Sequence, residues 1–175
     1  MPIIRQIAQL GQPVLRKVTR DIDDPAHPEV QALIDDMLVT VDDAHGVGLA
    51  APQVFQSLSL FVIASQPNPR YPKAPDLPPF ALINPELVWA SDEKEKGWEG
   101  CLSIPGLRGI VPRHRRIGVR YLTRHGEVRE DEFANFAARI FQHEFDHLKG
   151  VVFLDRMESP QELVTEKEYI RIVSG

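Results

Sequence analysis

The sequence lacks the features that would direct a protein into a membrane or an oxidising compartment. It contains one cysteine among 175 residues, so no internal disulfide can form. No apolar run approaches the length needed to cross a bilayer. The first residues, Met1 to Arg5, form neither a signal-peptide core nor an arginine-rich transit segment. We therefore expect a cytoplasmic protein without a membrane partner, or an organellar one only if a targeting peptide has been removed.

An excess of positive charge is also missing. The net charge of −5 and the pI of about 5.7 exclude the electrostatic footprint of a protein that binds DNA directly. We interpret the short basic run at residues 113–116 as a solvated strand edge, with contact to ribosomal RNA or to an acidic substrate as the alternative. The length suits one domain with a real core, and no internal repeat or boundary is visible, so we expect a single domain over residues 1–175.

The sequence does contain His-Glu-x-x-His at residues 143–147. Residues four apart lie on one face of an α-helix, so His143 and His147 can bind the same metal ion. Glu144 then projects beside that ion, where its carboxylate can take a proton from a bound water. The alternative is an ordinary helix that carries two histidines and a glutamate.

The surrounding residues favour the metal site. They recur at the three-and-four spacing of an amphipathic helix, and Gly150 supplies its end. Glu144 falls between Ile140 and Leu148 on the face expected to be buried. An ionised carboxylate there is costly unless a positive charge compensates it, and a divalent cation would do so.

Elsewhere the pattern predicts mixed secondary structure. Residues 28–43 read as an amphipathic helix with Asp35, Asp36 and Asp42 facing water. Strands are expected at residues 58–63 and 81–89, in a hairpin from residue 117 to just beyond 128, and at residues 169–173. Residues 91–96 read as a polar turn, and the proline-rich residues 66–79 predict an exposed loop or insertion.

Two further segments bear on chemistry. Residues 46–53 begin with Gly-x-Gly but lack the later glycine and the lysine of phosphate loops, so taken alone they predict a surface loop. A solitary cysteine such as Cys101 is usually a small buried hydrophobe. Two histidines, however, leave a catalytic metal one protein ligand short, and a thiolate would complete a three-ligand site with one open position.

Other metal sites remain open at this point. The extended pattern that ends in a third histidine fails, because Phe153 stands at that position. A downstream glutamate could instead be the third ligand, with Glu162, Glu166 and Glu168 as candidates. A non-catalytic site is a further alternative, although structural sites usually have four protein ligands and none completes this one at motif spacing.

Three segments together resemble the signature motifs of the peptide deformylase family, in the family's order. They are Gly46-Val47-Gly48-Leu49-Ala50-Ala51-Pro52-Gln53, Glu99-Gly100-Cys101-Leu102-Ser103-Ile104-Pro105 and Gln142-His143-Glu144-Phe145-Asp146-His147. Residues 13–18 and the Asn84-Pro85 step extend the likeness over nearly the whole chain. We expect one α+β catalytic domain in which antiparallel sheets wrap around a central buried helix that carries the metal motif.

The resemblance implies an enzyme that removes the N-formyl group from the formylmethionine of newly synthesised polypeptides and releases formate. It implies one divalent metal ion per chain, Fe(II) in the cell and Zn, Ni or Co as replacements. By matched motif positions, the ligands are Cys101, His143 and His147, and the acid/base is Glu144. Gln53 and the backbone N–H of Leu102 become donors to the oxyanion.

The resemblance also implies a substrate channel. Val47, Phe136 and Ile140 are expected to line an apolar pocket for the methionine side chain. Backbone groups of Val47, Gly48 and Gly100 would align the peptide as an added strand. Arg139 stands where some relatives have an aliphatic residue, and its stem could line the pocket while its head reaches water. Some family members contact the ribosome transiently through a long C-terminal helix, which this sequence lacks.

Overall fold

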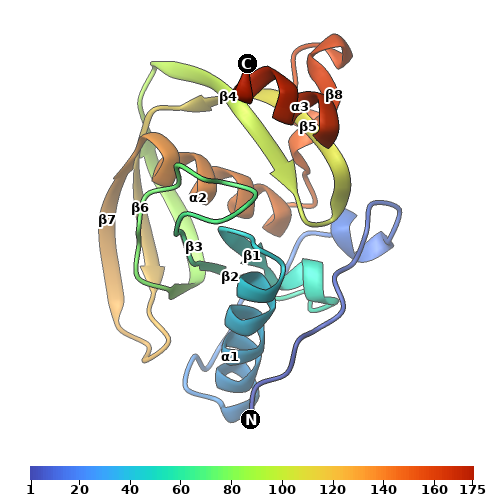
Figure 1. Cartoon of the computed structure of the whole chain (residues 1–175). Helices are drawn as coiled ribbons and strands as arrows, with labels where there is room; N and C mark the ends of the chain where they lie inside the picture. Colours follow the sequence, from blue (N-terminus) through green and yellow to red (C-terminus); the bar gives the residue numbers. More distant parts are fainter.

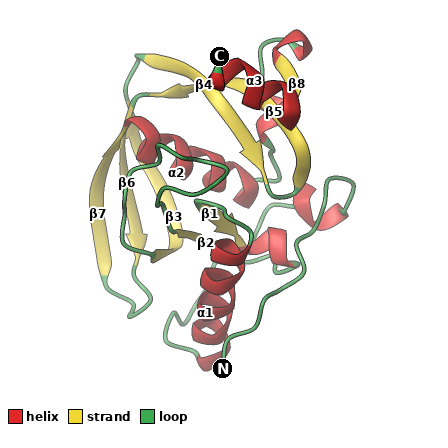
Figure 2. Ribbon diagram, viewed as in Figure 1, coloured by secondary structure: helices red, strands yellow, loops and turns green.

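Two antiparallel sheets form the framework of the computed structural model, which describes every residue from Met1 to Gly175 (Figures 1 and 2). The five-stranded sheet has the order β1 (Gly48–Ala50), β2 (Leu60–Ile63), β3 (Phe80–Ala90), β6 (Arg116–Leu122), β7 (Val128–Ala134). The three-stranded sheet has the order β4 (Lys94–Cys101), β5 (Ile104–His114), β8 (Leu163–Thr165). All strand pairs are antiparallel.

Three α-helices complete the fold: α1 (Pro28–Asp43), α2 (Asn135–Leu148) and α3 (Glu166–Ser174). Short 3-10 turns occupy Pro13–Arg16, Ala51–Val54, Phe153–Arg156 and Pro160–Glu162. In Figure 1, α2 runs between the two sheets, while α1 lies against the short strands of the larger sheet. None of the helices combines the length and apolar character needed to span a membrane. The α+β architecture around a central helix is therefore confirmed.

The helix α2 forms where the amphipathic pattern predicted it. Its apolar face includes Ala138, Ile140 and Phe141, all buried, and the Phe141 ring meets Phe61 of β2 edge-on at 5.3 Å between centroids. The opposite side of the helix is turned toward the β4–β5 hairpin. Burial of the helix on both sides explains how it can carry polar groups into the interior.

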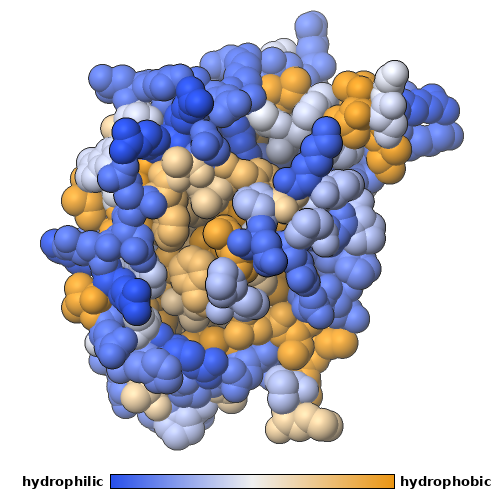
Figure 3. Space-filling model, turned by 60° about the vertical axis from the view of Figure 1, so that its left-hand side comes forward, coloured by the Kyte–Doolittle hydropathy of each residue, from blue (hydrophilic) through white to orange (hydrophobic).

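The core is divided between the two sides of the larger sheet. One apolar cluster joins α1 to this sheet, and a second joins α2 to it. Partly buried phenylalanines, Phe80, Phe133 and Phe136, border the second cluster. On the face shown in Figure 3, apolar side chains gather in the middle and hydrophilic side chains surround them. Each cluster packs on one face of the larger sheet, so this sheet positions both helices.

Three local predictions were wrong. Asp36 does not face water: it is buried, accepts a hydrogen bond from the Ile3 N–H at 2.8 Å and pairs with Arg5 at 2.9 Å. Residues 169–173 are helical, because Thr165 caps α3 by accepting from the Glu168 N–H. The polar turn at residues 91–96 is shorter than expected, since β4 already begins at Lys94.

The end of α2 depends on a glycine at a close crossing. Gly150 has φ +72°, and a Cβ added there would lie 2.6 Å from the backbone carbonyl of Arg16. We expect Gly150→Ala to lower the free energy of unfolding by about 2–4 kcal/mol, because the left-handed backbone costs 1–2 kcal/mol and the crossing segment must also move. Denaturant titration measures this loss.

Gly126→Ala is the matched control. Gly126 has φ +80°, but nothing lies within 4 Å of an added Cβ. Only the backbone cost applies there, so we expect a loss of about 1 kcal/mol. Equal losses in the two variants would show that the crossing at Arg16 contributes nothing.

Candidate active site

Three metal-ligand side chains meet beside α2. Cys101 ends β4, and His143 and His147 lie one turn apart on α2. One donor atom from each of the three residues lies within 4.8 Å of the other two, and Cys101 Sγ is 3.4 Å from His147 Nε2. No other His, Cys, Asp or Glu joins this group. The structure thus brings together the thiol and the two imidazoles that the motifs suggested.

The thiol of Cys101 is poised to ionise. Burial alone would raise its pKa, but the charges of His147 and His143 and their hydrogen bonds more than offset that effect. The pKa of Cys101 therefore lies well below its ordinary value. The thiolate is the form that binds metal, so the surroundings favour the ligand form of this side chain.

The ring of His143 is oriented by Glu99. The Nδ1 atom of His143 lies 2.8 Å from Glu99 Oε1, which leaves Nε2 as the nitrogen free to bind a metal. Glu99 is buried and also receives two hydrogen bonds of 2.9 Å from Arg113. Burial raises the pKa of Glu99, but the charge and hydrogen bonds of Arg113, with those of His143, hold it well below its ordinary value.

We predicted that the basic run at residues 113–116 would be a solvated strand edge. This prediction is only partly right, because Arg113 is buried. Its guanidinium joins Glu99 to Asp146, which lies 2.7 Å from Nη1. Arg156 also donates to Asp146, at 2.8 Å. A chain of alternating charges therefore runs behind the metal ligands from the β4–β5 hairpin to α2.

Glu144 lies beside these metal-ligand side chains and has an unpaired carboxylate oxygen. The residue is 4% exposed, and its Oε2 atom is buried without a hydrogen-bond partner. Burial raises the pKa of Glu144 to about 7, although the charges of His143 and His147 act in the opposite direction. A Cβ on Gly48 would lie 2.7 Å from the other carboxylate oxygen, Oε1. Gly48 therefore provides the space that this carboxylate occupies.

The side chain of Gln53 also approaches Cys101. Its Oε1 accepts from the Ala50 N–H at 2.9 Å, which fixes the amide. Its Nε2 donates to Ser103 Oγ at 3.1 Å and lies 3.6 Å from Cys101 Sγ. The prediction of a surface loop at residues 46–53 was wrong: the segment is buried throughout and forms β1 and a 3-10 turn. Its small residues let it pack closely against α2.

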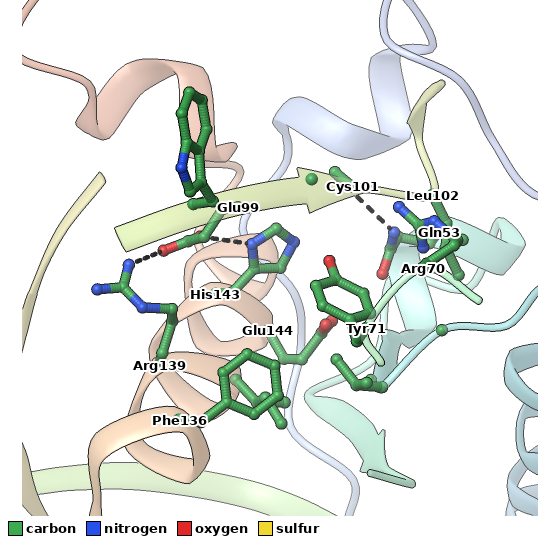
Figure 4. Close-up of a pocket in the computed structure, with 16 residues that line it drawn as sticks. Gln53, Arg70, Tyr71, Glu99, Cys101, Leu102, Phe136, Arg139, His143 and Glu144 are labelled. Atoms are coloured by element: carbon green, nitrogen blue, oxygen red, sulfur yellow. Dashed lines mark hydrogen bonds and ion pairs between the residues drawn. The ribbon is translucent and has the colours of Figure 1, made fainter. Parts of the chain in front are cut away.

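These groups line a cavity that opens to solvent (Figure 4). Its lining includes every residue expected to bind substrate: Val47, Gly48, Gly100, Phe136, Arg139 and Ile140. Leu102 also lines it, and its backbone N–H makes no hydrogen bond within the chain. The head of Arg139 does not reach water as expected. It donates to Glu99 at 2.8 Å and to the backbone carbonyls of Val111 and Glu95.

Sequence reasoning missed three residues of this site. Glu99 was read only as part of a motif, although it orients His143. Arg70 and Tyr71 line the cavity from the proline-rich segment, to which no role was assigned. The signal for this contact was weak: one tyrosine and one arginine within a segment whose composition otherwise predicts only an exposed loop.

The downstream glutamates do not reach the site. Glu162 pairs with Lys96 at 3.0 Å, Glu166 with Arg108 at 2.9 Å, and Glu168 with Arg171 at 2.8 Å. Of the candidates for a third donor, Cys101 is the one that lies within reach of both His143 and His147. A buried thiolate with two imidazoles suits a divalent transition metal such as iron or zinc. Three donors without a fourth also leave a position open, as in catalytic rather than structural sites.

Known proteins resemble this chain over most of its length. A sequence model of the polypeptide deformylase family matches residues 4–163. Peptide deformylase 2 from Nostoc sp. is 51% identical over 173 residues, which cover 99% of this chain and 97% of that protein. Peptide deformylase 1 from Xanthomonas campestris pv. campestris is 45% identical over 157 residues, 90% of this chain and 92% of that one.

Solved structures give the same result. The Met-Ala-Ser-bound class I type b peptide deformylase from Acinetobacter baumannii superposes with a TM-score of 0.86 at 40% identity, over 90% of this chain and 100% of that one. Peptide deformylase from Thermotoga maritima superposes with a TM-score of 0.80 at 38% identity, over 89% and 99%. The chain therefore belongs to the polypeptide deformylase family, whose known function is removal of the formyl group from nascent peptides.

Proposed function

We propose that this chain hydrolyses the N-formyl group of N-terminal formylmethionine on newly made polypeptides and releases formate. The observation that carries the proposal is the buried Cys101, His143 and His147 group beside the unpaired carboxylate oxygen of Glu144. A metal ligand set and a free proton acceptor on one cavity wall are the elements of metal-assisted hydrolysis. Family membership supplies the substrate class.

We propose that Cys101, His143 and His147 hold one divalent ion, Fe(II) in the cell and Zn, Ni or Co in a purified sample. The mixed sulfur and nitrogen donors support this choice over Mg or Ca, which prefer oxygen ligands. When bound, the ion polarises the formyl carbonyl and makes a water easier to deprotonate. The hydrogen bond that His143 Nδ1 donates to Glu99 supports the site by fixing the ring.

Glu144 is the proposed acid/base. Its Oε2 accepts a proton from the attacking water and then gives that proton to the leaving amine of methionine. The burial that leaves this oxygen without a partner supports the assignment, because the carboxylate has no competing hydrogen bond to break.

Two donors are proposed to stabilise the negative charge that develops on the formyl oxygen. They are the Nε2 amide group of Gln53 and the backbone N–H of Leu102, both on the cavity side of Cys101. The amide of Gln53 is held by Ala50, and the N–H of Leu102 is free. A fixed donor of this kind is worth about 3 kcal/mol in the transition state.

The substrate is proposed to bind as an added strand, with its methionine side chain among Val47, Phe136 and Ile140. Both strands that flank the cavity support this binding mode, because β1 and β4 each lie at the edge of their sheet. The backbone groups of Val47, Gly48 and Gly100 on that side are candidates to pair with a peptide. Arg139 contributes its apolar stem to the wall.

We further propose that residues 1–175 act as one catalytic domain, since α2 contacts both sheets. The cytoplasm is the proposed location, because nascent formylated chains are made there, and transient contact with the ribosome would bring the site to its substrate. No contact with DNA is needed for this chemistry.

Metal removal tests the proposed function. Anaerobically purified protein should release formate from formyl-Met-Ala-Ser, and the chelated protein should not, because the three donors then hold no ion. Adding Fe(II) or Zn back should restore formate release in proportion to the metal bound per chain. Metal-loaded protein that released no formate would contradict the proposal.

A further inference from the structure

The proline-rich loop at residues 66–79 forms part of the cavity wall. Both Arg70 and Tyr71 line the cavity, and the Tyr71 ring packs against Phe136 of α2 with 5.8 Å between centroids. In Figure 4, Tyr71 is drawn next to His143 and Glu144, and Arg70 is labelled on the same side as Gln53 and Leu102. This loop therefore borders the path of a peptide that extends from the proposed methionine pocket.

The loop is held in place by Arg108 of β5, a fully buried arginine. Its Nη2 donates to the backbone carbonyl of Arg70 at 3.2 Å, and its guanidinium lies 4.7 Å from the centre of the Tyr71 ring. On its other side it pairs with Glu166 and lies 4.6 Å from the ring of Tyr169. The backbone of Arg70 is thus fixed from behind by β5 and α3.

Arg70 differs from the other charged residues that line the cavity. Glu99 and Arg139 pair with each other, and the buried Oε2 of Glu144 has no hydrogen-bond partner. The guanidinium of Arg70 forms no ion pair or hydrogen bond and is half-buried. Its only close partner is the ring of Tyr71, 5.4 Å away. An unpaired positive charge at the cavity is therefore available to a substrate.

We propose that Arg70 is a specificity-determining residue that selects formylated peptides with an aspartate or glutamate at the second or third residue. This inference rests on the proposed deformylase activity. The methionine side chain occupies the apolar part of the cavity, so the following residues pass the loop. A guanidinium and a carboxylate form charge-assisted, bidentate hydrogen bonds, and no carboxylate of this chain already occupies Arg70.

Kinetics on amidated peptides test the proposal, because amidation removes the terminal carboxylate that would also attract Arg70. Formyl-Met-Ala-Asp-amide is compared with formyl-Met-Ala-Asn-amide, and formyl-Met-Asp-Ala-amide with formyl-Met-Asn-Ala-amide. In at least one pair we expect the aspartate peptide to have a kcat/KM about 3- to 10-fold higher, as suits a partly exposed ion pair. The difference should lie mainly in KM and shrink at high salt.

Substitutions on the loop assign the preference to one residue. Arg70→Gln should make the paired peptides equal, and Arg70→Glu should reverse the preference. Lys73→Glu is the control, because Lys73 is exposed on the same loop and does not line the cavity. It carries the same change of charge and should keep the preference of the wild type.

Each outcome is decisive. No difference between aspartate and asparagine peptides in the wild type, or the same preference in Arg70→Glu, overturns the role of Arg70. A preference lost equally in Lys73→Glu also overturns it, because the effect would then come from the charge of the loop as a whole. Turnover of formyl-Met-Ala-Ala-amide by each variant reports the intact site. Absence of formate from every peptide with the wild type would instead refute the proposed deformylase function.

Discussion

Glu144→Gln is expected to lower kcat for formate release by about 10²- to 10⁴-fold, the usual contribution of a positioned acid/base. Glutamine keeps the shape of the side chain in the space beside Gly48. Its amide cannot accept the proton from water or return it to the amine. The three metal donors are unchanged, so the variant should bind as much metal as the wild type.

The measurement combines initial rates with metal content per chain. Glu127→Gln, a charge-matched substitution on the exposed β6–β7 turn, should leave both unchanged. A Glu144→Gln variant that lost its metal would place this residue in metal binding rather than in proton transfer. One that kept more than a tenth of the activity with metal bound would remove it from the mechanism.

Arg113→Met is expected to lower the free energy of unfolding by about 3 kcal/mol. The variant leaves two buried carboxylates, Glu99 and Asp146, without the cation between them. Removing one partner of a buried charge pair typically costs 3–5 kcal/mol. The value should lie near the low end, because Glu99 keeps Arg139 and Asp146 keeps Arg156.

Arg115→Met, two residues away, is the control for this prediction. Arg115 pairs with Glu93, and both side chains are about half exposed or more, at 49% and 67%. Such pairs contribute about 0–1 kcal/mol, so the control should unfold nearly as the wild type does. Thermal and denaturant unfolding of the metal-loaded proteins measure the difference. Equal effects at the two positions would mean that burial of Arg113 adds nothing.

The elements that the sequence predicted well are those with local signals. The apolar stripe around His143 and the glycine after the helix define α2 without reference to distant residues. The same is true of α1, whose proline lies at its first position. Chemistry alone left Cys101 and the downstream glutamates as candidates for the third metal ligand. The family resemblance selected Cys101, and the structure places this thiol within reach of both imidazoles.

The errors have a common physical origin in long-range packing. The buried state of Arg113 depends on Asp146, 33 residues away, and that of Asp36 depends on the N-terminal arm. Neither pairing leaves a periodic pattern in the sequence. Residues 169–173 alternate like a strand, yet the cap at Thr165 and the ring contact between Tyr169 and Trp98 favour a short helix on the smaller sheet.

The solitary thiol has a chemical consequence beyond binding. A lowered pKa favours the thiolate, which is the form of the side chain that peroxide converts to a sulfenic acid. Cys101 has no second cysteine with which to form a protective disulfide. Reduction of the sulfenic acid therefore requires a small thiol that can reach the buried sulfur of Cys101. Without one, further oxidation to the sulfinic acid is irreversible and removes one of the three proposed metal ligands.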